Sequence, residues 1–275
     1  MGNNNYPFAP QLTISDAVNQ AYAHWHAGQA PQAEHLCLRV LAASKNQPDA
    51  LHLLGLMAHA YGQLDLALGY LRKACLSLTA PAGYHSNLAE ICRIKGLLPE
   101  AEKAARHAVR LDPALVAGWN NLGIVLQERG ELQASLECLQ RVTALQPDNA
   151  EVHNNLANTY KCMGQVAEAK RHYHRALELH PNYAPAHSNL ALVLSDEGRY
   201  EEAYAAARLA IDIDPQLIDA YFNLAEIETS RLRPGEALRW LDALLAFAPE
   251  HAGGLAARAH ILASALSSQV PPVRA

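Results

Sequence analysis

The sequence predicts an all-α solenoid of repeated helical hairpins. Prolines recur every 34 residues at Pro113, Pro147, Pro181, Pro215 and Pro249. Glycines recur with the same spacing at Gly28, Gly62, Gly96, Gly130, Gly164 and Gly198. Only 6% of the 275 residues are aromatic and 50% are hydrophobic, which suits close packing of helices. A fixed period of this length is typical of tandem repeats.

The period runs without insertion over residues 14–251 and gives seven repeats. Their first residues are Ile14, Pro48, Ala82, Val116, Ala150, Ala184 and Ile218. Apolar residues at positions 4, 7, 8 and 11 of a repeat lie on one face of a first helix, helix A. The glycine at position 15 ends helix A, and the proline at position 32 ends a second helix, helix B. Each repeat is therefore predicted to be a helix, a short turn and a helix.

Small residues at two positions explain how helices A and B of one repeat pack together. Position 8 is Ala21, Gly55, Ala89, Gly123, Ala157, Ala191 and Ala225. Position 20 is Ala33, Ala67, Ala101, Ser135, Ala169, Ala203 and Ala237. A larger side chain at either position would force the two helix axes apart.

The seventh repeat and the chain ends depart from the pattern. Leu232 replaces the turn glycine, which predicts a reshaped turn with Pro234 opening the next helix. Residues 1–13 form an N-terminal extension, residues 252–266 a C-terminal capping helix, and residues 267–275 a flexible tail. In the capping helix we expect Leu255, Ala259 and Leu262 to cover the seventh repeat. We expect Ile261 and Leu266 to leave part of this end apolar and exposed.

These features resemble the tetratricopeptide repeat family. The fourth repeat matches it best, with Trp119, Leu122, Gly123 and Leu126 in helix A and Pro147 at position 32. The resemblance covers residues 14–251 and implies a right-handed superhelix whose concave groove is lined by the A helices. On a helix, positions 2, 5, 6, 9, 12 and 13 lie away from the buried stripe. These positions are therefore expected to line the groove.

Asparagine dominates position 6: Asn19, Asn87, Asn121, Asn155, Asn189 and Asn223, with Leu53 as the exception. A primary amide both donates and accepts, so such a row could hold the backbone of an extended peptide. The same amides could instead bond the neighbouring repeat, and the sequence leaves both interpretations open. The row is similar to the asparagine ladder of O-linked N-acetylglucosamine transferases.

The other candidate groove residues are polar, charged or aromatic. They are Asn120, Asn154, Asn158, Tyr22, Trp25, Glu90, Arg93, Glu128, Lys161, Asp196 and Glu226. Acidic residues outnumber basic ones at these positions, which favours a basic or polar partner segment, although an ordinary solvated surface explains the same pattern.

Signals of other functions are missing from the sequence. It contains no phosphate loop, GxGxxG, GxSxG or HExxH motif, so we expect no enzyme activity and no cofactor. The fourteen histidines lack metal-ligand spacing, and His85, His153 and His187 at position 4 are predicted to pack in the core, so no metal site is expected. A net charge of −5 without basic runs argues against nucleic acid and anionic membranes. The five cysteines include no CxxC pair, which with the lack of a leader segment favours the cytoplasm.

The predicted function is a scaffold that binds an extended or helical segment of a partner protein in its concave groove. Two alternatives remain. One is the substrate-recognition arm of a protein glycosyltransferase similar to O-linked N-acetylglucosamine transferases, and the other is a scaffold that self-assembles through its terminal repeats.

Overall fold

A computed structural model describes residues 12–267, and these form fifteen α-helices. The chain divides into two compact units within α8, one ending at Arg141 and one beginning at Val142. The helices are α1 Ile14–His26, α2 Ala30–Ala43, α3 Pro48–Ala60, α4 Leu64–Ala74, α5 Ala82–Ile94, α6 Leu98–Leu111, α7 Val116–Glu128, α8 Leu132–Leu145, α9 Ala150–Cys162, α10 Val166–Leu179, α11 Ala184–Asp196, α12 Tyr200–Ile213, α13 Ile218–Ser230, α14 Pro234–Phe247 and α15 Ala252–Ser267.

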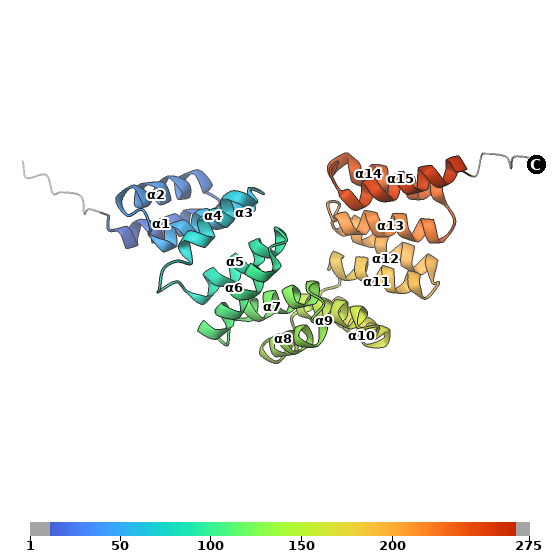
Figure 1. Cartoon of the computed structure of the whole chain (residues 1–275), viewed down its shortest axis with the longest axis horizontal. Coiled ribbons are helices and arrows are strands. Elements are labelled where there is room, and N and C mark those ends of the chain that lie inside the picture. Colours follow the sequence, from blue (N-terminus) through green and yellow to red (C-terminus); the bar gives the residue numbers. More distant parts are fainter. Residues whose placement is uncertain (1–11, 268–275) are drawn as a thin grey trace, which may run out of the picture. The chain divides into compact units, whose positions relative to one another are not determined.

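The helices pair into hairpins, so the predicted all-α fold of helix–turn–helix repeats is confirmed. Helix A of each hairpin packs on its own helix B, and helix B packs on helix A of the next hairpin within the same unit (Figure 1). We number the hairpins one to seven, from α1–α2 to α13–α14. Because each hairpin contacts mainly its neighbours, the core is a series of small apolar clusters along each unit.

Close contact inside a hairpin depends on the small residue at position 8. A Cβ added at Gly55 would lie 2.8 Å from the Leu71 side chain, and one at Gly123 would lie 2.8 Å from Leu139 Cγ. Both leucines belong to helix B of the same hairpin. Helix A therefore turns positions 4, 8 and 11 toward its own helix B, and every position 8 in the seven hairpins is buried.

Six of the seven A–B turns use glycine in the left-handed region, with φ between 71° and 79°. The turn between α13 and α14 keeps the same hydrogen bonds with Leu232 at φ 59°. The Leu232 amide donates to Thr229 O at 3.0 Å, as the Gly198 amide donates to Ser195 O at 2.9 Å. The prediction of a reshaped turn is wrong, because the leucine adopts the glycine conformation and points its side chain into solvent. Pro234 does open α14, as predicted.

Helix α15 packs on the seventh hairpin through a different face from the predicted one. Ile261, only 6% exposed, joins Ala225, Ala237 and Leu241 in an apolar cluster, and Gly254 is buried beside Leu244. In contrast, Leu255, Ala259 and Leu262 are exposed. These three stand at positions 4, 8 and 11, which contact helix B in the other hairpins, so the prediction named the wrong face. The side chain of Leu266 lies outside the described residues.

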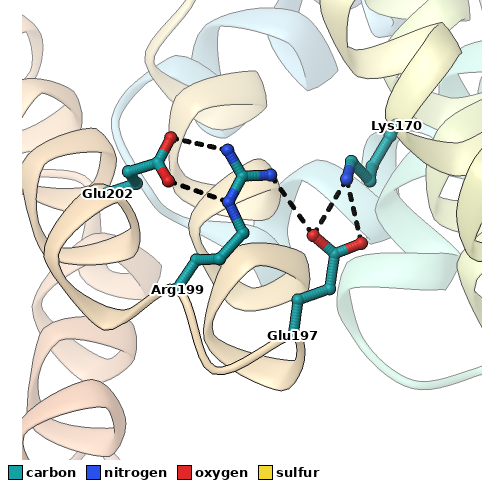
Figure 2. Close-up of polar contacts among 4 residues, drawn as sticks. All are labelled: Lys170, Glu197, Arg199 and Glu202. Carbon is teal, nitrogen blue, oxygen red and sulfur yellow. Dashed lines mark hydrogen bonds and ion pairs between the residues drawn. The ribbon is translucent and has the colours of Figure 1, made fainter.

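Ion pairs join consecutive hairpins at the A–B turns. In Figure 2, Lys170 of α10 donates to both carboxylate oxygens of Glu197, at 2.9 Å each, and Glu197 lies at the end of α11. Arg199 lies beside Glu197 and forms a two-point pair with Glu202 at 2.8 and 2.6 Å. Side chains in these pairs are a quarter to three-fifths exposed, so solvent screens the attraction and each pair contributes little to stability.

Candidate functional site

Four asparagines at position 6, which are Asn87, Asn121, Asn189 and Asn223, bond the hairpin before their own. Asn121 Nδ2 donates to Ser86 O at 3.0 Å and Ser86 Oγ at 3.2 Å. Asn223 repeats this geometry on Ser188, at 3.1 and 2.8 Å. Asn189 Nδ2 donates to Asn154 Oδ1 at 3.0 Å. Each bond joins residues 35 apart, so the row forms a regular set of links between A helices within each unit.

In each of these links the asparagine donates a hydrogen bond from its Nδ2 atom. Among the described residues, the Oδ1 atoms of Asn87, Asn121, Asn189 and Asn223 accept no hydrogen bond. None of the four oxygens is fully shielded from solvent. The link fixes the orientation of the carboxamide, which leaves an acceptor with a defined direction on the surface of helix A.

The predicted site residues differ in how accessible they are. The exposed ones are Asn19, Glu128, Asp196 and Glu226. The half-buried ones are Asn87, Asn121, Asn158, Asn189, Tyr22, Trp25, Glu90, Arg93 and Lys161. The buried ones are Asn120, Asn154, Asn155 and Asn223. We call the exposed and half-buried set the A-helix surface.

Near the N-terminus, a hydrogen-bonded chain links the first three hairpins. Asn87 Nδ2 donates to His52 Nε2 at 2.8 Å. The His52 proton is therefore on Nδ1, where it donates to the Tyr22 hydroxyl oxygen at 2.8 Å. Tyr22 in turn donates to the Asp49 carbonyl at 3.4 Å. Burial raises the pKa of Tyr22 to about 12 and lowers the pKa of His52 to about 4, so both groups are neutral at pH 7.

Tyr84 completes this N-terminal cluster. Its ring stacks on the His52 imidazole with centroids 3.7 Å apart, and its hydroxyl donates to the Asp49 carboxylate. Burial, followed by the bond to Asp49, raises the pKa of Tyr84 above its ordinary value. Tyr22 was predicted to line the groove, but its partners could not be predicted, because they lie in different repeats and share no motif.

The charged residues of the A-helix surface form one cluster in each unit. In the first unit, Arg93 pairs with Glu90 at 3.0 Å and with Glu128 at 2.8 Å, which leaves one negative charge in excess. In the second unit, partial desolvation and the nearby Asp196 carboxylate raise the pKa of Glu226, while the Lys161 ammonium opposes the shift. Each cluster therefore contains two carboxylates and one cationic side chain.

Position 4 carries a second repeated bond that the sequence analysis did not predict. A ring N–H or hydroxyl there donates to the carbonyl of the proline six residues earlier, at the junction between hairpins. The pairs are Trp119 with Pro113 at 2.9 Å, His153 with Pro147 at 3.1 Å, His187 with Pro181 at 2.8 Å and Tyr221 with Pro215 at 3.0 Å. Histidine thus replaces tryptophan at this position because it supplies the same donor.

The histidines that do meet one another form pairs. His153 Nδ1 lies 3.0 Å from His172 Nδ1, and the His85 and His107 rings meet edge to face at 4.3 Å. Burial, with the neighbouring His153, lowers the pKa of His172 to about 4. Among the described residues, no three His, Cys, Asp or Glu side chains gather in a way that could hold a metal ion.

Residues 114–182 and 148–216 match the model of the tetratricopeptide repeat. The match supports the tetratricopeptide repeat family. Among curated proteins, the comparison found no significant relative. Within residues 12–267, no helix has both the length and the apolar character that crossing a bilayer requires.

Several solved structures share the fold of the chain, and one of them is a tetratricopeptide repeat protein. A repeat protein from Parabacteroides merdae is 13% identical, with a TM-score of 0.76 over 90% of this chain and 98% of that one. A chain of the APC/C hetero-tetramer Cut9–Hcn1 is 17% identical, with a TM-score of 0.71 over 93% of this chain. This chain spans 50% of the length of that one. PilF of Pseudomonas aeruginosa is 22% identical, with a TM-score of 0.57 over 78% of this chain and 97% of that one.

Proposed function

We propose that the protein is an interaction scaffold whose A-helix surface binds an extended segment of a partner protein. The observation that carries this proposal is the row of oriented asparagine oxygens. Each Oδ1 is held by a donor bond to the preceding hairpin and remains able to accept a backbone N–H. The row therefore stabilises the repeat stack and offers acceptors to a partner at the same time.

The spacing of the row suits an extended chain. Packed helices lie roughly 8–10 Å apart, and an extended chain advances about 3.3 Å per residue. Neighbouring asparagines on the A-helix surface, such as Asn87 and Asn121, would thus meet about every third residue of a bound segment. Contacts through the backbone give affinity without strict sequence selection.

Charge supplies the selectivity in this proposal. Glu90 and Glu128 share the single guanidinium of Arg93, and the Glu226 carboxylate lies near both the Asp196 carboxylate and the Lys161 ammonium. A lysine or arginine of the partner would find an unbalanced carboxylate in either unit. A chain of the Cut9–Hcn1 hetero-tetramer has the same fold and is solved in an assembly with a second kind of protein, which supports a role in binding other proteins.

The test begins with a peptide selected on the purified chain from a displayed library of random sequences. Its affinity is measured by isothermal titration for the chain and for the Asn87→Ala/Asn121→Ala variant, in which both changes lie in the first unit. Loss of two acceptors should weaken binding about 10- to 30-fold, at roughly 1 kcal/mol for each hydrogen bond. The selected peptides should be basic, and binding should weaken as salt is added.

A second variant separates binding from stability. Asn121→Asp keeps an acceptor oxygen but loses the donor to Ser86, so it should lower the melting temperature while retaining the peptide. Asn182→Ala, an exposed asparagine away from the A-helix surface, should change neither. Equal affinity of the folded alanine variant and the unmodified chain would show that the row has a structural role only.

A further inference from the structure

Helix α15 leaves one of its two apolar faces without a partner inside the described part of the chain. Its inner face is covered, because Ile261 packs on Leu241 and Gly254 on Leu244. Its outer face carries Leu255 at 48% exposure and Leu262 at 38%, with exposed Ala259 between them. These residues are spaced i, i+4 and i+7, so they form one continuous stripe along the helix.

The stripe continues an interface that the molecule already contains. In α13 the equivalent position 8 is Ala225, which is 2% exposed because α14 covers it. In α7 the equivalent Gly123 lies directly against Leu139 of α8. The stripe on α15 therefore repeats the arrangement that packs against an antiparallel helix inside a hairpin, with a small residue at position 8 and apolar residues on either side of it.

The outer face of α15 carries no net charge that would repel a second copy. Its exposed described residues are Ala252, Gly253, Leu255, Ala256, Ala259, His260, Leu262, Ala263 and Ser264. The nearby Arg258 is neutralised by Asp242, with Nε 2.6 Å from Oδ1. This face therefore offers no charge that would select a charged partner. The same face of a second copy could approach it without electrostatic repulsion.

The order of residues in the stripe is also nearly symmetric. Leu255 lies four residues before Ala259, and Leu262 lies three residues after it. Two such helices crossing antiparallel at Ala259 would place Leu255 of each against Leu262 of the other. The small residue at the crossing allows close approach, as glycine and alanine do at position 8 inside the hairpins.

We propose that α15 is a dimerisation helix, which pairs antiparallel with α15 of a second copy about a twofold axis through Ala259. The contact is isologous, so it closes at two copies and does not propagate into a filament. Each copy supplies to the other the cover that a helix B would supply within a hairpin.

The first test measures mass against concentration by sedimentation equilibrium on the full chain. The unmodified chain should convert from monomer to dimer as concentration rises. Leu255→Glu should shift this equilibrium toward monomer by roughly 100-fold, because the contact would bury an unpaired carboxylate. Leu209→Glu, at a leucine of similar exposure on α12, should leave the equilibrium unchanged.

The second test locates the axis by cross-linking. Ala259→Cys should give a covalent dimer on mild oxidation, since the two new thiols would face each other at the crossing. The unmodified chain, whose Cys162 is already exposed, and Ala205→Cys on the exposed side of α12 should not.

Three results would overturn the proposal. A chain that stays monomeric at all concentrations shows that α15 does not self-associate. A dimer that persists in Leu255→Glu uses another surface. A dimer that forms only after residues 268–275 are deleted shows that the stripe is covered by this chain's own C-terminal segment.

Discussion

Helices α13 and α15 begin 34 residues apart, yet α13 is buried on two faces and α15 on one. In α13, Ala220, Leu224 and Ile227 pack toward the preceding hairpin, and Ala225 packs toward α14. In α15, Gly254 and Ile261 pack toward the preceding hairpin. No helix of the described chain covers α15 in the way that α14 covers α13. The difference shows that a helix A has two separate interfaces, one made by its own hairpin and one by its neighbour.

The largest expected effect on stability comes from buried histidines, which distinguish the packed hairpins from the exposed surface of α15. Burial lowers the pKa of His52, His85 and His172 to about 4, whereas His260 on α15 is exposed. Between pH 6.5 and 4 the unfolded chain binds more protons at the three buried sites, so the free energy of unfolding falls as the pH falls. We expect a loss of about 3 kcal/mol in total, after allowance for partial exposure of the rings.

Urea unfolding at several pH values between 7 and 4 measures this loss. His52→Gln should reduce the pH dependence by about a third, because one of three titrating groups is removed. A free energy of unfolding that stays level between pH 6.5 and 4 would contradict the burial of neutral imidazoles.

A larger residue at position 8 should give the second largest effect on stability, and this effect should differ between α13 and α15. Ala225→Leu places a larger side chain in the contact between α13 and α14, which should cost about 2 kcal/mol. Ala259→Leu makes the same change on the open face of α15 and should cost no more than about 0.5 kcal/mol. Urea midpoints of both variants, compared at protein concentrations low enough for monomer, check the contrast. Equal losses would mean that α15 is covered as α13 is.

The asparagine link extends the comparison, because it is present in α13 and lost in α15. Asn223 is 4% exposed and bonds Ser188, whereas Ala257 holds the equivalent place in α15. Asn223→Ala should lower the free energy of unfolding by about 1.5 kcal/mol, since two buried acceptors on Ser188 lose their donor. Asn182→Ala serves as the control in the same urea experiment. A loss no larger than that of the control would mean that the link does not hold the hairpins together.

A substitution in the turn before α14 should have the smallest effect on stability. Unlike the substitutions above, it should stabilise the protein. Leu232 adopts φ 59°, where a side chain costs about 1 kcal/mol relative to glycine. Leu232→Gly should therefore raise the melting temperature, and Gly198→Leu at the equivalent turn should lower it by a similar amount. Differential scanning calorimetry of the two variants tests the pair. A neutral or destabilising Leu232→Gly would show that the leucine side chain makes a compensating contact.

The sequence predicted the all-α repeat fold because proline, glycine and small residues are local signals that recur. It did not predict how neighbouring repeats bond, since Asn121 and Ser86, or His52 and Tyr22, become partners only after the hairpins stack. The error in α15 has the same origin. Periodicity identified Leu255 and Ile261 as apolar, but only the packing showed which of them contacts the seventh hairpin. Leu232 was misjudged because its turn geometry is fixed by the helices on either side.

The asparagine links have a consequence for how such a chain can change length in evolution. Each link spans 35 residues, one more than the repeat, so it depends only on the previous repeat. Deletion of residues 184–217 would bring Asn223 opposite Asn154, the residue that Asn189 bonds now. Duplication of a whole repeat would likewise recreate the link at the new junction. Insertions of any other length would place a non-matching residue there, so gene rearrangements that preserve the stack come in whole repeats.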